Sequence, residues 1–203
     1  KGTNVKEVIA SNPVLAPFGK KQLGKIVNEI FQRYDRLGNP KTSAVLDKMK
    51  DQGFKYSTVA GFTVSLADIK IVEGKEKILS HGDSEVNEIQ EAFEMGLLTE
   101  EERHKQVCDV WDKVKRSVEN DLQVQFAKDK RNPIYMMSDS GARGNISNIL
   151  QLAGMRGLMG NTTGGTIELP IKSCFREGLT VSEFFIATHG ARKGGADTAL
   201  KTA

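Results

Sequence analysis

Cysteine is scarce in this sequence, and its two cysteines fall into no recognisable pattern. Cys108 and Cys174 lie far apart, and no C-x-x-C spacing occurs in the 203 residues. Disulfide frameworks and zinc ribbons both need repeated, closely spaced cysteines. The sequence therefore predicts two free, buried thiols, because a free cysteine usually behaves as a small hydrophobic residue.

Long apolar runs are also absent. No stretch approaches the roughly 20 apolar residues of a membrane-spanning helix, and no segment has the order of charged, apolar and small residues that marks a secretory signal. With 38% hydrophobic and 27% charged residues, the composition is that of a globular protein with a core, in one domain or two small ones. The expected location is the cytoplasm, with no membrane partner.

The residue patterns of a self-contained active site are missing as well. No Asp-x-Asp pair is present to hold magnesium, and the loop G-N-T-T-G-G at residues 160–165 lacks the Gly-Lys-Ser/Thr ending of a P-loop. His104 and Cys108 share one predicted helix, but zinc needs four ligands, or three and a water molecule. The sequence predicts no catalytic residue and no metal site, and a small phosphate-binding enzyme is only a minor alternative.

The first region, residues 1–82, contains apolar residues with helical periodicity. An amphipathic helix is expected from the apolar residues spaced three and four positions apart, and Gly38, Asn39 and Pro40 would end it. A second short helix is expected over 43–52 with Gly53 as its C-terminal cap, and residues 56–66 would form a strand or an extended crossing. The apolar residues of the first helix are Leu23, Ile26, Val27, Ile30, Phe31 and Tyr34. We predict a small mixed α/β or helical subdomain over residues 1–82.

Two long helices joined by a tight turn are predicted over residues 83–131. The turn would be formed by residues 95–98, and Thr99 with Glu102 has the form of a capping box that opens the second helix. Helices joined so tightly should pack antiparallel as a projecting hairpin. The first apolar stripe comprises Val86, Ile89, Phe93 and Leu97, and the second Val107, Val110, Trp111, Val114, Val118, Leu122 and Phe126.

The hairpin is also the acidic part of the chain. Residues 73–132 hold 10 basic and 15 acidic side chains, against 12 and 6 in residues 1–72 and 7 and 5 in residues 133–203. Phosphates would be repelled by such a segment, whereas a basic protein partner would be attracted. The candidate docking residues at the hairpin tip are Glu91, Glu94, Glu100, Glu101 and Glu102. A solvated helix face is the alternative explanation of the charge run.

A linker and a glycine-rich stretch follow the hairpin over residues 132–177. Pro133 disfavours helix at Asn132, and Ser138, Asp139 or Ser140 would cap a helix whose apolar positions are Ile146, Ile149, Leu150 and Ala153. A glycine-rich loop over 154–170 would then end in the alternating residues 166–169.

A long helix that contains three glycines is predicted at residues 178–203. Each interior glycine costs a helix roughly 1 kcal/mol relative to alanine. Gly190, Gly194 and Gly195 therefore need a reason such as bending or close approach to a large partner.

Basic residues of the same helix suit contact with nucleic acid. Arg192 and Lys193 are adjacent, and Lys201 follows two turns later on nearly the same face. Phosphate contact fits this arrangement, although solvent-facing helix charges would have the same spacing.

Three motifs carry a resemblance to a known family. They are residues 178–203, the run N-P-I-Y-M-M-S-D-S-G-A-R-G at 132–144 and the run L-A-G-M-R-G-L-M at 152–159. Together with G-F-T-V-S-L-A-D at 61–68, they make the chain similar over its whole length to the β′ subunit of bacterial RNA polymerase. The start at Lys1 and the end within a helix fit an internal piece of that larger subunit. The expected fold is mainly α with minor β, built from a projecting antiparallel hairpin and a helix–loop–long-helix segment.

The resemblance implies a role for each part of the chain. Residues 1–82 would belong to the pore region, 83–131 to the rim helices of the secondary channel, and 178–203 to the N-terminal and middle part of the bridge helix. Lys201, Thr202, Ala203, Arg192 and Lys193 would lie near template and nucleotide, and Gly190, Gly194 and Gly195 would form the hinge. Residues 158–168 would pack against the bridge helix.

The resemblance also implies partners and a cofactor for the assembled enzyme. Expected partners are the other polymerase subunits, template DNA, RNA, nucleoside triphosphates and the transcription factors of the secondary channel, in a bacterial cytoplasm at the nucleoid. Magnesium would be held by ligands outside this segment, which alone should be inactive. A free-standing module whose acidic hairpin binds a basic protein is the alternative.

Overall fold

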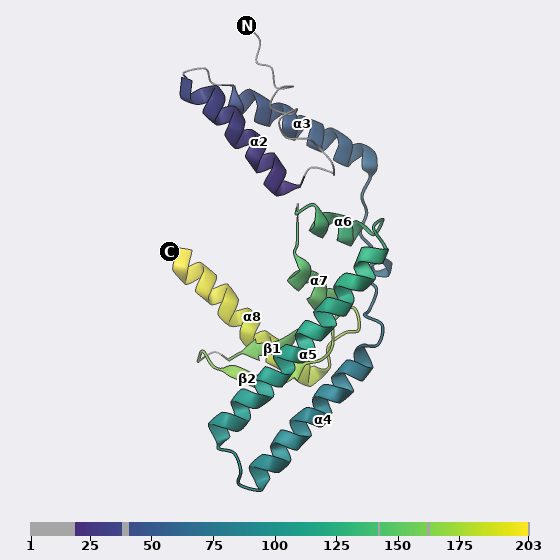
Figure 1. Ribbon diagram of the computed structural model, residues 1–203, viewed down its shortest axis with the longest axis vertical. Helices are drawn as coiled ribbons and strands as arrows, with labels where there is room; N and C mark the ends of the chain where they lie inside the picture. The colour runs from purple at the N-terminus through teal and green to yellow at the C-terminus, as the bar shows by residue number, and fades with distance from the viewer. Residues whose placement is uncertain (1–18, 38–40, 142, 162, 203) are drawn as a thin grey trace. The chain divides into compact units, whose positions relative to one another are not determined.

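A computed structural model describes residues 19–37, 41–141, 143–161 and 163–202 of the chain (Figure 1). The helix-ending residues expected at 38–40 lie outside this part. The chain divides into two compact units, one of residues 1–64 with 133–144 and the other of 65–132 with 145–203. These limits differ from the four segments expected from the sequence. Each unit is described separately below.

The first unit is a small arrangement of helices. Helix α2 (Lys20–Arg33) is followed by the 3-10 turn η1 (Asp35–Leu37), α3 (Thr42–Ala60) and α6 (Pro133–Asp139). Ile26 and Ile30 on α2 are buried, and Tyr34 and Val45 pack against them. The amphipathic helix predicted at the start of the chain is therefore present, and Ile26 and Ile30 of its apolar stripe form the small core of this unit, whereas Phe31 of the same stripe is 45% exposed.

The region from residue 43 to 66 was predicted wrongly. Gly53 does not end a helix, because α3 continues as one helix to Ala60. The cap is Gly61, which adopts the left-handed conformation with φ of 59° and donates its N–H to the carbonyl of Ser57. A left-handed residue is the usual helix terminator, and glycine adopts it without a Cβ penalty. Gly53 costs the helix only about 1 kcal/mol, which the uninterrupted hydrogen bonds outweigh.

An antiparallel helical hairpin dominates the second unit (Figure 1). It consists of α4 (Lys75–Glu94) and α5 (Glu100–Lys128), which pack side by side. The predicted capping box is present, since the Thr99 hydroxyl accepts the N–H of Glu102 and the Glu102 carboxylate accepts the N–H of Thr99. All seven predicted apolar residues of α5 are buried. The first helix begins at Lys75, before the residue 83 expected from the sequence.

Helix α5 ends at Lys128, whereas the hairpin was predicted to extend to residue 131, and the cap of the next predicted helix differs from the prediction. Ser138 and Asp139 lie within α6 instead of capping the following helix, α7 (Ile146–Ala153). The cap of α7 is Asn145, whose side chain accepts the N–H of Asn148 at 3.0 Å. Asparagine is as good an N-cap as serine or aspartate. Ile149, Leu150 and Ala153 are buried as expected.

The glycine-rich stretch forms a two-stranded antiparallel sheet. Strand β1 (Gly157–Gly160) pairs with β2 (Thr166–Ile171), with Met159 opposite Ile167 and Gly160 opposite Thr166. The register is irregular between Gly157 and Met159. Both strands pack on α5 and on the last helix, α8 (Val181–Thr202). The protein is thus mainly helical with a minor β component, as predicted.

No helix among the described residues combines the length and the apolar character that crossing a bilayer requires. Of the two cysteines, both are free, but only Cys174 is fully buried while Cys108 is half-buried.

Candidate functional site

Helix α8 is a long helix that buries very little of itself. Of its 22 residues only Ala187 is buried, although it carries large apolar side chains. Phe184, Phe185 and Leu200 are 57%, 64% and 76% exposed. A monomeric domain rarely leaves such apolar area open, so an exposed face of this kind marks an interaction surface.

The sheet supports α8 on one side, at Gly190. A Cβ atom at this position would lie 2.7 Å from Cε of Met159 on β1 and 3.9 Å from the carbonyl oxygen of Gly160. The absence of a side chain lets the helix lie directly on the strand. Three residues further on, the Lys193 ammonium donates to the carbonyl oxygen of Asn161 at 3.3 Å, in the turn between the strands.

The other two glycines of α8 are in a different environment. Nothing lies within 4 Å of a Cβ atom built at Gly194 or Gly195. Thr198 donates its hydroxyl back to the carbonyl of Gly194 at 2.7 Å, a type of bond that often bends helices. Beyond Lys193, every residue of α8 to Thr202 is exposed except Asp197.

The start of α8 is held by one carboxylate. Glu183 accepts the N–H and the hydroxyl of Thr180, both at 3.0 Å, and the N–H of Ser173 at 3.1 Å. Partial burial raises the pKa of Glu183, but these hydrogen bonds lower it more, so that the pKa lies below its ordinary value. The carboxylate thus ties the helix to the segment that follows β2.

The residues predicted to lie near template and nucleotide are distributed along this helix. Arg192, Lys201 and Thr202 are exposed, whereas Lys193 is half-buried and bound to Asn161. The Thr202 hydroxyl donates to the carbonyls of Thr198 and Ala199. Ala203 lies outside the described residues.

The acidic residues of the hairpin tip are all exposed, but three of them have side-chain contacts. Glu102 belongs to the capping box, and hydrogen bonds from Thr99 lower its pKa. Glu100 pairs with Arg103 at 2.6 Å, and that hydrogen bond lowers its pKa. Glu94 accepts a hydrogen bond from the side chain of Gln90. Glu101 and Glu91 complete the set on the two helices.

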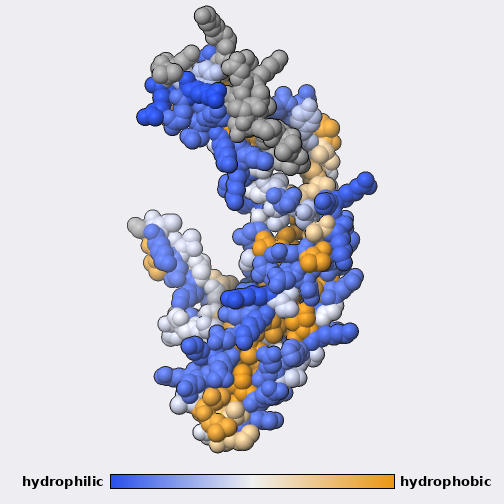
Figure 2. Space-filling view, viewed as in Figure 1, coloured by the Kyte–Doolittle hydropathy of each residue, from blue (hydrophilic) through white to orange (hydrophobic). Residues whose placement is uncertain are grey.

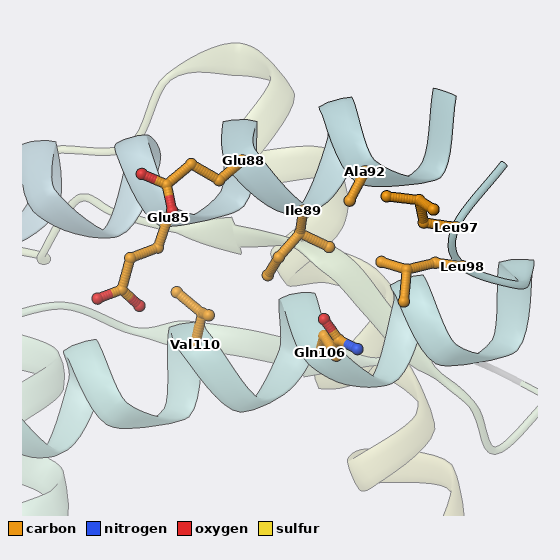
Figure 3. A pocket seen from close by; sticks show the side chains of 8 residues that line it. All are labelled: Glu85, Glu88, Ile89, Ala92, Leu97, Leu98, Gln106 and Val110. Atoms are coloured by element: carbon orange, nitrogen blue, oxygen red, sulfur yellow. The ribbon is translucent and has the colours of Figure 1, made fainter. Parts of the chain in front are cut away.

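A groove lies between the two helices at the tip (Figure 3). Its volume is about 490 Å³. Apolar side chains from both helices and from the turn face it, with carboxylates at one end (Figure 3). Its lining residues are Glu85, Glu88, Ile89, Ala92, Leu97, Leu98, Gln106 and Val110. The turn exposes Met95 and the lining residue Leu97, which are 69% and 71% accessible, and Figure 2 shows this apolar surface over the tip.

A polar cluster joins the hairpin to the sheet. Arg103 of α5 lies 3.1 Å from a carboxylate oxygen of Glu168 on β2, and Nδ1 of His104 lies 3.3 Å from the same oxygen. Arg103 also stacks over the ring of Phe93 at 5.4 Å. Hydrogen bonds to Glu100 and Glu168 raise the pKa of Arg103, which is therefore always charged. The Cys108 sulfur lies 3.8 Å from Nε2 of His104, and burial raises the pKa of this thiol.

Two further ion pairs connect α4 to the segment that follows β2. Lys172, which follows β2, binds both carboxylate oxygens of Asp83 on α4 at 2.6 and 2.8 Å and lies 5.1 Å from the Trp111 ring centroid. Lys75 is 5% exposed and pairs with Glu177 ahead of α8. Burial raises the pKa of Glu177, but its hydrogen bonds to Lys75 and Cys174 lower it more, which leaves a net decrease.

These contacts were not predicted from the sequence. Glu168, Arg103 and His104 come from segments about sixty residues apart and belong to no motif. The sequence held one signal of such a contact. Glu168 is the single acidic residue in the alternating run 166–169, and the other residues of this run are apolar or carry a hydroxyl group.

No metal site is evident in the described ranges, since no three His, Cys, Asp or Glu side chains there are grouped so that they could hold a metal ion. The His104, Cys108 and Glu168 cluster described above is accordingly a polar contact between α5 and β2.

Two known family models match parts of the chain. Residues 98–176 match the family model for RNA polymerase Rpb1, domain 4, and residues 1–69 match that for RNA polymerase Rpb1, domain 3. The class is thus an RNA polymerase subunit of the Rpb1 type. All 203 residues align with the DNA-directed RNA polymerase subunit beta' of Bacillus cytotoxicus at 58% identity and of Bacillus subtilis at 57%.

The chain belongs to the family of bacterial RNA polymerase β′ subunits, in which it corresponds to an internal segment. It spans 16% of the length of these relatives.

Proposed function

We propose that this chain acts within a DNA-directed RNA polymerase as part of its catalytic subunit, where α8 lies along the active-centre cleft beside the template. One observation carries this assignment. A 22-residue helix is supported by a small sheet on one side and buries only Ala187. Arg192 and Lys201 on its exposed surface suit phosphate contact, and its open aromatic residues suit packing against other parts of a large assembly.

In this proposal α8 is a bridge helix that bends. Gly190 is held against Met159, whereas the surroundings of Gly194 and Gly195 are open. Bending would therefore occur mainly at Gly194 and Gly195, directly after Lys193, which is still bound to the turn between the strands. Two conformers that differ by a few kcal/mol can both be populated during a reaction cycle.

The hairpin would line the channel through which nucleoside triphosphates enter, and its tip would bind transcription factors. Three observations support a protein partner there. The tip is acidic, a groove lies between its helices, and Met95 and Leu97 are exposed beside it. An apolar centre with a charged rim is the usual composition of a protein interface, and negative charge disfavours nucleic acid.

The reaction would be templated nucleotidyl transfer by the assembled enzyme, with the other subunits, DNA, RNA and nucleotides as partners. The described residues offer no group of ligands that fits a metal ion. In this proposal the magnesium of such a reaction is held by other parts of the subunit. The contribution of this chain would be to place template and nucleotide.

The test is to change the helix within an assembled polymerase. Gly190→Pro removes a helical hydrogen bond and kinks α8 at a cost of about 3 kcal/mol or more, and Thr202→Trp adds bulk at the proposed template face. Both should slow elongation at least tenfold. Gly190→Ala is the matched control, since only the flexible end of Met159 must move, and it should change the rate much less. Unchanged elongation with both variants would remove α8 from the active centre.

A further inference from the structure

We propose that Glu168 is a positioning residue that couples the tip of the α4–α5 hairpin to α8 through the β1–β2 sheet. The inference rests on the proposed function in one respect, namely that the material to be tested is the assembled polymerase. It concerns a different property, which is how the position of α8 depends on the position of the hairpin tip.

The first step is the contact between hairpin and sheet. Arg103 lies in the first turns of α5, close to the turn that joins it to α4, and its side chain is 13% exposed. It bridges Glu100 of its own helix and Glu168 of β2, and it stacks on Phe93 of α4. One guanidinium thus contacts both helices of the hairpin and the sheet, because its planar fork presents several donors in a fixed geometry.

The second step is that the carboxylate of Glu168 has two partners on α5. Arg103 and His104 approach the same oxygen, at 3.1 and 3.3 Å. Two partners on successive residues of one helix fix the position of β2 along α5. The other ion pairs of the sheet region, Lys172 with Asp83 and Lys75 with Glu177, involve residues after Pro170, towards or beyond the end of β2.

The third step is the contact between sheet and α8. Ile167, next to Glu168, pairs with Met159, and Met159 lies so close to Gly190 that a Cβ atom there would be 2.7 Å from its Cε. The turn between the strands also accepts a hydrogen bond from Lys193. A short chain of contacts therefore runs from Phe93 through Arg103, Glu168 and Met159 to Gly190.

The consequence is mechanical. A displacement of the hairpin tip would move Arg103, and with it the carboxylate of β2. The strand that carries this carboxylate shares its sheet with the residues that support α8 at Gly190. Ligand binding at the tip would thereby shift the position of the helix without touching it. Coupling of this kind needs a contiguous set of packed contacts, and the described residues supply one.

The experiment measures hydrogen exchange of α8 in assembled polymerase that carries Glu168→Gln. We expect exchange at residues 186–194 to be faster by about 1.5- to 5-fold, which is the range for loss of a partly exposed ion pair. Asp129→Asn is the matched control, because it removes another cross-segment ion pair, with Lys70, at the far end of α5. The control should leave α8 exchange unchanged.

A second variant separates coupling from local damage. If Arg103 acts on α8 only through Glu168, then adding Arg103→Gln to Glu168→Gln should leave α8 exchange at the level of Glu168→Gln alone. A purely local role would speed exchange in β2 and the first turns of α5 only. Exchange in α8 equal to that of the control, or a further acceleration in the double variant, would overturn the proposal.

The same samples distinguish this proposal from the proposed function. Hydrogen exchange makes no use of catalysis. If hydrogen exchange in α8 is faster in Glu168→Gln while the elongation rate is unchanged, the coupling between hairpin and α8 is supported and the proposed role of α8 in elongation is contradicted. If α8 exchange matches the control, the coupling fails whatever the elongation rate.

Discussion

Gly82 of α4 lies close to α5 and leaves no room for a side chain. A Cβ atom there would lie 2.7 Å from Cγ2 of Val114 and 3.4 Å from the Trp111 ring. The clash is with a short, branched side chain that cannot swing away as a methionine can. This glycine is therefore required by packing, and nothing in the sequence distinguished it from the glycines of turns.

We predict that Gly82→Ala destabilises the protein. Overpacking of a tight core contact costs about 1–3 kcal/mol, while the higher helix propensity of alanine returns roughly 1 kcal/mol, so the expected net loss is up to about 2 kcal/mol. Thermal unfolding followed by circular dichroism measures it. Val114→Ala in the same chain should make Gly82→Ala less costly, since it removes the clashing methyl group, whereas additive losses would show that the contact is not the cause.

Single residues also show what a sequence can and cannot reveal. The capping box of Thr99 and Glu102 was predictable because both partners lie within one helical turn. The contacts of Glu168 and of Gly82 were not, because each depends on a residue brought close only by the fold. Local hydrogen bonds leave a sequence pattern, whereas tertiary contacts between ordinary residue types leave none.

At the scale of elements, the two ends of the hairpin have different tasks. The base is fastened by buried and paired charges, while the tip presents exposed carboxylates and an open groove.

Strongly periodic helices such as α5 were predicted well, because a continuous buried stripe leaves a clear pattern. Helix α3 was predicted poorly, because it buries no residue and a glycine in its middle resembles a cap.

The tip should discriminate between partners by charge. In an assembled polymerase, Glu94→Lys with Glu101→Lys should weaken the binding of a purified transcript-cleavage factor about tenfold or more, with a smaller effect at high salt because exposed charges are screened. Glu100 and Glu102 are left unchanged because they pair with Arg103 and belong to the capping box, whereas Glu94 loses only a hydrogen bond from Gln90 on the same helix. Binding is measured by titration at two salt concentrations. Affinity equal to that of the unchanged polymerase would exclude the tip as the docking site.

At the scale of the whole molecule, stability should depend on acid-sensitive carboxylates around the base of α8. The folded protein lowers the pKa of Glu177 and Glu183 below the ordinary value of 4.5. Below this value the unfolded chain binds more protons than the folded one, so the stabilisation is present above about pH 4.5 and is lost as the pH falls towards the folded pKa values.

The corresponding prediction is a fall in the melting temperature as the pH is lowered from 5 through the region below about 4.5. Glu183→Gln should reduce this dependence, because glutamine does not titrate; its one amide oxygen can still accept the hydrogen bonds of Thr180, while the bond from the N–H of Ser173 to the other oxygen is lost. Melting curves of both proteins over this pH range provide the measurement. An identical acid dependence in the variant would mean that Glu183 does not contribute.

The division of the chain into two units could not be predicted from the sequence. Residues 133–144 belong with the first 64 residues, although the hairpin separates them along the chain. A linker at Pro133 was recognisable from its effect on the preceding residue, but where the chain goes after it depends on long-range packing. The family motifs identified the class of protein, and the structure added how its elements are fastened together.

The most direct test of the account is a photo-crosslinking amino acid in place of Thr202 in an assembled, elongating polymerase. If α8 lies across the template, irradiation should attach this position to the template strand near the growing end of the RNA. Crosslinks to protein alone, with none to nucleic acid in an actively elongating complex, would contradict the central claim.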